Sequence, residues 1–164
     1  MQRHPRQKIT RFWIGLIFAT ILFTACKEDA CKDNNCQEGI CVEGVCACAD
    51  GYEGENCDAE ARLKFLNAAW VNTSICQSNA TVLSTSIEPS PANIDRVRIQ
   101  GLMQSSDIVE ASVQEDSLKI EIQVYGTAYV EGLGILNDST LTIQYDVIQT
   151  GGEREDCVSV LTLD

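Results

Sequence analysis

Nine cysteines are the residues of this chain best able to do covalent chemistry, and their spacing divides them into three groups. Cys26 stands apart, six more crowd into residues 31–57, and Cys76 and Cys157 are widely separated in the remainder. Cysteines serve as disulfide partners, metal ligands, nucleophiles or lipid attachment points. Because nine is an odd number, one cysteine is left over if all the others form disulfides.

Histidine is nearly absent, which restricts catalytic and metal chemistry. His4 is the one histidine, and it lies in a basic stretch at the start of the chain. The rest of the chain therefore lacks the usual neutral-pH base and the commonest metal ligand. Its serines and carboxylates form no nucleophile elbow, metal pair or phosphate loop. We expect no catalytic residue, no metal and no cofactor. The acidic group Glu153, Glu155 and Asp156 is typical of a solvated loop, and weak binding of a cation is the alternative.

The charge of the chain is strongly acidic and unevenly distributed. Its 164 residues allow one ordinary domain, or a small module and a medium-sized one, and they carry a net charge of −12. Residues 1–25 hold four basic side chains and no acid, so the remainder has 8 basic and 24 acidic side chains, a net charge of −16. Such a surface repels phosphate backbones and anionic lipid headgroups, which argues against nucleic-acid binding.

The first 26 residues have the organisation of an export signal. A basic segment is followed by fourteen uncharged residues, 12–25, which is short of the about 20 residues that a spanning helix needs. Phe23-Thr24-Ala25-Cys26 resembles a bacterial lipobox, with Phe23 where leucine is usual. The resemblance implies a lipoprotein signal peptide over 1–25 and acylation of Cys26, and two or three acyl chains give stable anchoring. An ordinary secretory signal or an uncleaved anchor is the alternative.

Lys27-Glu28-Asp29 directly follows Cys26. It resembles the tag of one lysine and several acids that routes lipoproteins of Bacteroidota-type bacteria to the outer face of the outer membrane. The resemblance implies a lipid-anchored outer-membrane protein that faces the cell exterior. The alternative is a solvated acidic tether over residues 26–30 on a periplasmic protein.

Six cysteines within residues 31–57 predict a disulfide-rich module, because so short a segment cannot bury a real core. Arithmetic alone allows fifteen pairings. Cys46-x-Cys48, then eight residues to Cys57 with Gly51-Tyr52 and Gly54 between them, closely resembles the EGF-like module. The pairing that this resemblance implies is Cys31–Cys41, Cys36–Cys46 and Cys48–Cys57.

Metal binding and signalling by this module are both disfavoured. Cys-x-Cys spacing, the lack of histidine and the export signal indicate structural disulfides and not a zinc site. Calcium-binding EGF-like modules carry an aspartate or asparagine between the third and fourth cysteines, where this chain has Val42-Glu43-Gly44-Val45. EGF-like growth factors usually place arginine before the sixth cysteine, where this chain has Asn56.

After a short polar linker, 58–62, hydrophobic residues alternate with polar ones over residues 63–164, and turn-forming residues separate most of the runs. The strongest runs are Leu118–Val124, Ala128–Gly132 and Leu141–Val147; the weaker ones are Phe65–Ile75, Leu83–Ile87, Val97–Gly101, Val109–Val113 and Val158–Val160. About eight half-buried strands predict an antiparallel up-and-down β domain, either a sandwich or a lipocalin-like barrel. We expect the alternating hydrophobic residues, including Leu118, Ile120, Ile122 and Val124, to form its core.

The two remaining cysteines lie on the first and last elements of this domain. If Cys26 is acylated and six cysteines pair within the module, Cys76 and Cys157 are left to form a disulfide with each other. The order of signal, lipid cysteine, acidic tether, EGF-like module and disulfide-bracketed β domain resembles a group of small Bacteroidota surface lipoproteins. No established activity of such β domains can be carried over.

Two functions are compatible with these features. The first is a non-enzymatic surface lipoprotein in which the EGF-like module is a stiff spacer and the β domain contacts an extracellular protein or glycan. The second is an outer-membrane carrier that holds a small apolar ligand inside a lipocalin-like barrel. Phe65, Trp70, Gly132 and Gly134 are loosely similar to lipocalin positions. Small residues at inward positions would leave room for a ligand, but they suit close packing of the sheet equally well: Gly101, Ala111, Gly126, Ala128 and Gly132.

Overall fold

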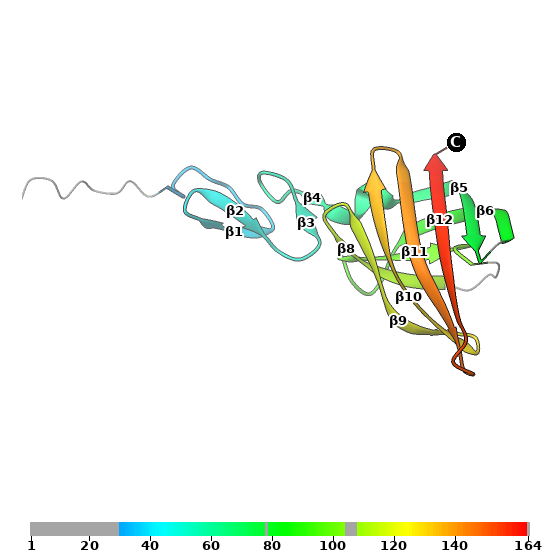
Figure 1. Cartoon of the computed structure of the whole chain (residues 1–164). Coiled ribbons are helices and arrows are strands. Elements are labelled where there is room, and N and C mark those ends of the chain that lie inside the picture. Colours follow the sequence, from blue (N-terminus) through cyan, green and yellow to red (C-terminus); the bar gives the residue numbers. More distant parts are fainter. Residues whose placement is uncertain (1–29, 78, 104–107, 164) are drawn as a thin grey trace, which may run out of the picture.

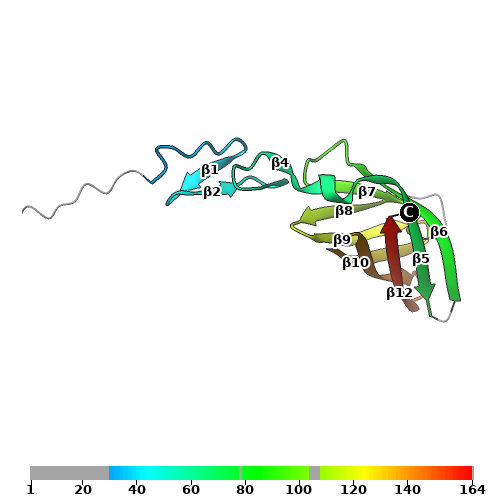
Figure 2. The ribbon, with the colours of Figure 1, turned by 90° about the horizontal axis from the view of Figure 1, so that it is seen from above.

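A computed structural model describes residues 30–77, 79–103 and 108–163 of the chain. The fold is mainly β, with a small disulfide-rich module and an antiparallel eight-stranded barrel placed end to end (Figures 1 and 2). The predicted signal peptide, Cys26 and the tag Lys27-Glu28-Asp29 lie outside the described residues.

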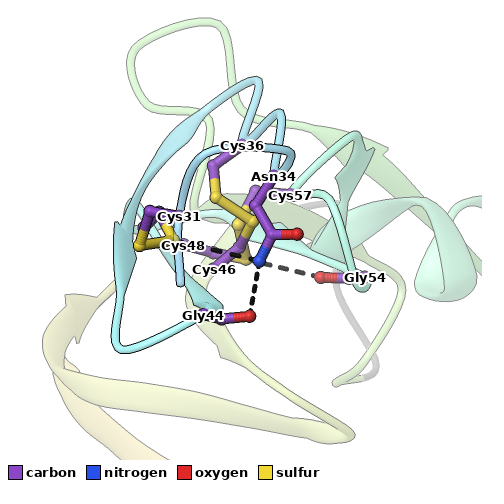
Figure 3. The surroundings of a disulfide bond; sticks show 9 residues. Cys31, Asn34, Cys36, Gly44, Cys46, Cys48, Gly54 and Cys57 are labelled. Atoms are coloured by element: carbon purple, nitrogen blue, oxygen red, sulfur yellow. Dashed lines mark hydrogen bonds between the residues drawn. A yellow bond between two sulfur atoms is a disulfide. The ribbon is translucent and has the colours of Figure 1, made fainter. Parts of the chain in front are cut away.

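The module is built on one short hairpin and three disulfides. Strands β1 (Gly39–Val42) and β2 (Val45–Cys48) pair in antiparallel fashion. The disulfides are Cys31–Cys41, Cys36–Cys46 and Cys48–Cys57, the three pairs that the resemblance to EGF-like modules implies. In Figure 3 the Asn34 side chain points at the hairpin turn and donates a hydrogen bond to the Gly44 carbonyl. Disulfides and hydrogen bonds thus take the place of a hydrophobic core.

The segment expected to be a polar linker, 58–62, is structured. Its strand β4 (Ala59–Glu60) pairs with β3 (Tyr52–Glu53) of the module, and it runs into the 3₁₀ helix η2 (Ala61–Phe65). The Ala61 amide donates to the Gly51 carbonyl over 2.9 Å. Gly51 has a φ of +88°, and a Cβ there would come within 2.7 Å of the Ile94 side chain. This close packing fixes the connection between the module and the barrel, hereafter called the joint.

A cationic side chain reinforces the joint. The Lys64 ammonium lies 2.7 Å from a Glu53 carboxylate oxygen on the module and 2.8 Å from Asp116 on a barrel turn. Burial favours the neutral amine, but the hydrogen bonds and charges of Asp116 and Glu53 outweigh it, so the pKa of Lys64 lies above its usual value. Lys64 therefore links the module and the barrel electrostatically.

The barrel is an up-and-down meander in which each strand pairs with the next and the last strand, β12, pairs with the first, β5. The strands are β5 (Asn67–Cys76), β6 (Asn79–Pro89), β7 (Arg96–Gln100), β8 (Ile108–Gln114), β9 (Ser117–Tyr125), β10 (Ala128–Asn137), β11 (Thr140–Gln149) and β12 (Arg154–Leu163). The pairing of β5 with β12 settles the choice between sandwich and barrel, which the sequence left open.

One end of the barrel is closed by η2 and filled by large side chains. Phe65 of η2 and Trp70 of β5 are fully buried, and the Trp70 indole donates to the Phe65 carbonyl over 3.2 Å. Most of the other large buried residues lie on the strand halves next to η2, and they include Ile87, Val97, Leu118, Leu141 and Leu161. The half of the barrel beside the module is therefore a solid core.

The expectation that Leu118, Ile120, Ile122 and Val124 share one buried face is wrong beyond Ile120. The register between β9 and β10 shifts, so that Gly132 pairs with Ile120 but Val130 pairs with Gln123. An extra residue of this kind, a β-bulge, reverses which side chains face inward. Ile122 and Val124 are consequently 62% and 71% exposed.

Gln123 takes an inward position after the bulge and replaces missing backbone pairing. The β8–β9 ladder is confined to Ser112–Gln114 and Ser117–Lys119. Farther along, the Gln123 amide accepts from the Glu110 amide N–H over 3.0 Å and donates to the Glu110 carbonyl over 2.8 Å. The side chain thus holds β8 to β9 where the two strands separate.

Candidate functional site

The end of the barrel away from η2 is open and contains a cavity of about 500 Å³. Its lining comes from inward-facing residues of six strands, β5, β6, β9, β10, β11 and β12, with Met103 and the β9–β10 turn at the rim. The lining residues include Ser74, Thr81, Tyr125, Ala128, Tyr145 and Glu155. The β9–β10 and β11–β12 turns lie at this end, on the side of the barrel away from the module (Figure 1). The mouth of the cavity therefore points away from the module.

The floor of the cavity is polar. The Tyr145 hydroxyl lies 3.1 Å from the Ser74 hydroxyl and donates to the Leu102 carbonyl over 3.3 Å. Below it, the buried Asn72 amide donates to the Thr85 hydroxyl over 3.1 Å. The lumen thus changes from an apolar core beside η2 to a hydrogen-bonded layer beneath the cavity.

Two buried polar atoms of this layer have no hydrogen-bond partner among the described residues, Asn72 Oδ1 and Ser159 Oγ. Ser159 faces Ser74 across the β12–β5 ladder. A buried polar atom without a partner costs free energy of about 1–3 kcal/mol. This layer therefore holds polar groups beneath the cavity at a cost to the stability of the barrel.

The Cys76–Cys157 disulfide lies in the wall of the cavity. The two cysteines face each other on β5 and β12, so the disulfide joins the first and last strands of the barrel at the seam where it closes. The sequence predicted this pair. The Glu155 carboxylate lies within 4.8 Å of both sulfur atoms. Because disulfide sulfurs are not thiolate ligands, this group of atoms is not a metal site.

The acidic group Glu153, Glu155 and Asp156 is divided by the strand. Alternation along β12 turns Glu155 toward the cavity and Asp156 outward, while Glu153 lies exposed in the preceding turn. Outside the barrel, Arg154 forms a hydrogen bond with Asp146, and this lowers the pKa of Asp146. The hydrogen bond with Asp146 and its negative charge raise the pKa of Asp156.

This division leaves Glu155 without a basic partner. Arg154 is directed to the outer surface, where its ion-pair partners are Asp146, Asp156 and Glu131. Within residues 30–77, 79–103 and 108–163, no salt bridge involves Glu155. The sequence interpretation of a solvated acidic loop therefore fits Glu153 but not Glu155, which is half-buried in the cavity wall.

The small residues that were expected to leave room inside the barrel have different environments. Gly126 and Ala128 line the cavity, as expected of a carrier. Ala111 lies in the packed core, and a Cβ on Gly132 would come within 2.6 Å of Tyr145. Gly101 has a φ of +81° at the end of β7, so a glycine is needed there for the backbone conformation and not for space in the lumen.

A second feature is an uncharged apolar band on the outer wall of β10, β11, β12 and β5. Residues that pair across neighbouring strands lie side by side in this band. One such row runs from Leu133 through Gln144 and Val158 to Ile75. Its exposed hydrophobic residues are Val71, Ile75, Leu133, Ile135, Val158 and Val160. The expectation that Val158–Val160 contributes to the core is therefore wrong, because both valines face outward and are 36% exposed.

Neither the cavity nor the outer band was predicted residue by residue, although the sequence of β5 has a pattern that points to both. Along β5 the inward positions include Asn72 and Ser74, while Val71 and Ile75 point outward. This is the reverse of the pattern expected for a strand on a hydrophobic core. The reversal places polar groups in the lumen and hydrophobic groups on the surface.

Comparison with known proteins adds no assignment. No protein-family model matches the chain, and no curated protein matches it. In the part of the chain that the structure describes, no helix has the length and hydrophobicity required to cross a membrane.

Proposed function

We propose that this protein is a non-enzymatic, lipid-anchored surface protein whose barrel binds a small molecule at its open end. The observation that carries the proposal is the contrast between the two halves of the lumen. One half is packed solid beside η2, while the other opens into a cavity of about 500 Å³. This volume lies within the range of small-molecule pockets, and the mouth of a β-barrel is a common place for them.

The lining of the cavity supports a ligand of mixed polarity and not a wholly apolar one. Met103, Ala128 and Val147 provide apolar surface, whereas the Ser74 and Tyr145 hydroxyls provide hydrogen-bonding groups at the floor. A small number of polar groups set in an apolar wall is the usual composition of a selective ligand pocket.

The EGF-like module serves in this proposal as a spacer between the membrane and the barrel. Its three disulfides and the joint at Gly51 and Lys64 support a stiff connection. With acyl chains on Cys26 and Lys27-Glu28-Asp29 as export tag, the mouth of the barrel would point away from the membrane.

Native mass spectrometry of the protein purified from its own host tests ligand binding. We expect a bound small molecule on the wild type and on Thr73→Trp, which places a bulky group on the outer wall. We expect none on Thr81→Trp, because Thr81 lines the cavity and tryptophan fills it. A clean apo mass for the wild type, or equal occupancy of the two variants, would contradict binding in the cavity.

Protease shaving of intact cells tests the location. Cleavage of the wild type, together with protection of a variant in which Lys27, Glu28 and Asp29 are all alanine, is the expected result. Protection of both proteins would place the barrel in the periplasm and contradict the export tag.

The outer band favours a second candidate function, the display of the barrel for a protein partner. An uncharged surface on a chain as acidic as this one suits a partner with an equally uncharged, apolar patch. In-cell cross-linking from a photoreactive residue at Val158 should capture a discrete partner band, which Ile75→Lys abolishes. The same residue introduced at Ile122, on an exposed site outside the band, is the control; equal capture from both positions would contradict the proposal.

A further inference from the structure

We infer that the cavity selects a small organic cation, such as a molecule with an ammonium group, and that Glu155 is the carboxylate that pairs with it. The inference rests on the proposed binding function and specifies the chemical class of the ligand.

Glu155 is the one charged side chain among the residues that line the cavity in the described structure. It is half-buried, and it sits beside the Cys76–Cys157 disulfide on the wall that leads down to the Tyr145 hydroxyl. The Tyr145 oxygen lies 3.8 Å from the Cys76 sulfur. A partly buried carboxylate without a basic partner carries a desolvation cost that a cationic ligand would offset.

The surroundings of the cavity disfavour anions. Its described lining contains no lysine, arginine or histidine, and the nearby Arg154 is held on the outer surface by Asp146 and Asp156. Beyond residue 25 the chain has a net charge of −16, which raises the local concentration of cations and repels anions.

The donor set fits an organic cation better than a metal ion. Calcium takes six to eight oxygen ligands, commonly several carboxylates, whereas this wall offers one carboxylate, and the neighbouring sulfurs are in a disulfide. Tyr125 and Tyr145 line the same cavity, and aromatic rings attract ammonium groups. Met103 and Val147 add apolar surface for a hydrocarbon portion of the ligand.

Calorimetric titration of the full-length protein in detergent tests the inference with three probes of one length: hexylammonium, hexanol and hexanoate. We expect hexylammonium to bind about tenfold tighter than hexanol, the ratio expected of one partly buried ion pair. Hexanoate should bind more weakly than hexanol, and added salt should reduce the affinity for hexylammonium but not that for hexanol.

Two matched variants distinguish the effect of the Glu155 carboxylate from that of the overall negative charge of the protein. Glu155→Gln should bind hexylammonium and hexanol equally while it retains hexanol affinity, which also shows that the cavity remains formed. Glu153→Gln makes the same charge change two residues away in the exposed turn and should keep the wild-type preference. A preference that Glu155→Gln retains, or that Glu153→Gln also loses, would overturn the role of Glu155.

The outcomes also distinguish the inference from the proposed function. Equal affinity of the wild type for hexylammonium and hexanol, with both blocked by Thr81→Trp, would overturn the ligand class and leave a binding cavity. Failure of all three probes to bind would overturn the inference and count against the proposed function as well.

Discussion

Removal of the Cys76–Cys157 disulfide should cost the barrel much of its stability. The disulfide closes a loop between residues separated by 81 positions. The chain-entropy estimate for such a loop is about 4.5 kcal/mol, a large share of the roughly 5–15 kcal/mol that stabilises a typical domain. The double variant Cys76→Ala/Cys157→Ala removes the bridge without leaving a free thiol. Its barrel should still form, because seven residue pairs connect β12 to β5.

Urea unfolding followed by Trp70 fluorescence measures this loss. Trp70 is buried in the barrel core, and it is the one tryptophan of protein produced without the predicted signal peptide, residues 1–25. We expect the free energy of unfolding to fall by about 4.5 kcal/mol, with the slope against urea increased because the unfolded chain expands.

The variant Cys48→Ala/Cys57→Ala removes a disulfide of the module and should leave the Trp70 transition nearly unchanged. A loss below about 1.5 kcal/mol on removal of Cys76–Cys157 would refute the entropic account, because it would show that the unfolded chain is hardly restricted by the bridge.

Three further predictions concern single side chains. Ser159→Ala should raise the free energy of unfolding by about 1 kcal/mol in urea titrations, because it deletes a buried hydroxyl that has no partner among the described residues; a loss of stability would contradict this. The raised pKa of Lys64 contributes stability that is complete below the unfolded lysine pKa of about 10.4 and is lost as the pH rises through the folded value. Above pH 10, the melting temperature should therefore fall more steeply with rising pH for the wild type than for Lys64→Met. Ile120→Thr should cost about 2 kcal/mol and Ile122→Thr under about 0.5 kcal/mol, since Ile120 is buried and Ile122 exposed; equal costs would contradict the bulge.

The module was predictable from the sequence because its structure is encoded locally. Cysteine spacing of a few residues and the glycines between Cys48 and Cys57 restrict the possible turns. The predicted segments of the barrel correspond to strands for a similar reason, since period-two alternation is a local property. The joint was not predictable, because residues 58–62 look polar in isolation and become ordered by contact with Gly51.

The closure of the barrel, and which side chains of each strand point inward, were harder to predict because they depend on pairing partners that are distant in the sequence. The pairing of β12 with β5 brings together segments about 80 residues apart, and a sandwich would have used the same strands. The bulge in β9 reverses the facing of Ile122 and Val124, although the hydrophobic alternation continues through it without interruption. The pattern along one strand does not contain the register of its neighbour.

The cavity and the outer band have one physical origin at the seam of the barrel. On β5 and β12, Asn72, Ser74 and Ser159 point into the lumen while Ile75 and Val158 point out, so polarity is inverted on both strands that close the barrel. A shift of one residue on both strands would bury the valine and isoleucine side chains, but it would also expose Trp70 and Leu161, which are buried at inward positions of the same strands. The Cys76–Cys157 disulfide fixes the position of β5 relative to β12, because the two cysteines lie opposite each other in the ladder. Burial of Trp70 and Leu161 therefore sets which face of the two strands points inward, and together with the bridge it places hydroxyls beneath the cavity and directs Glu155, two residues from Cys157, into its wall.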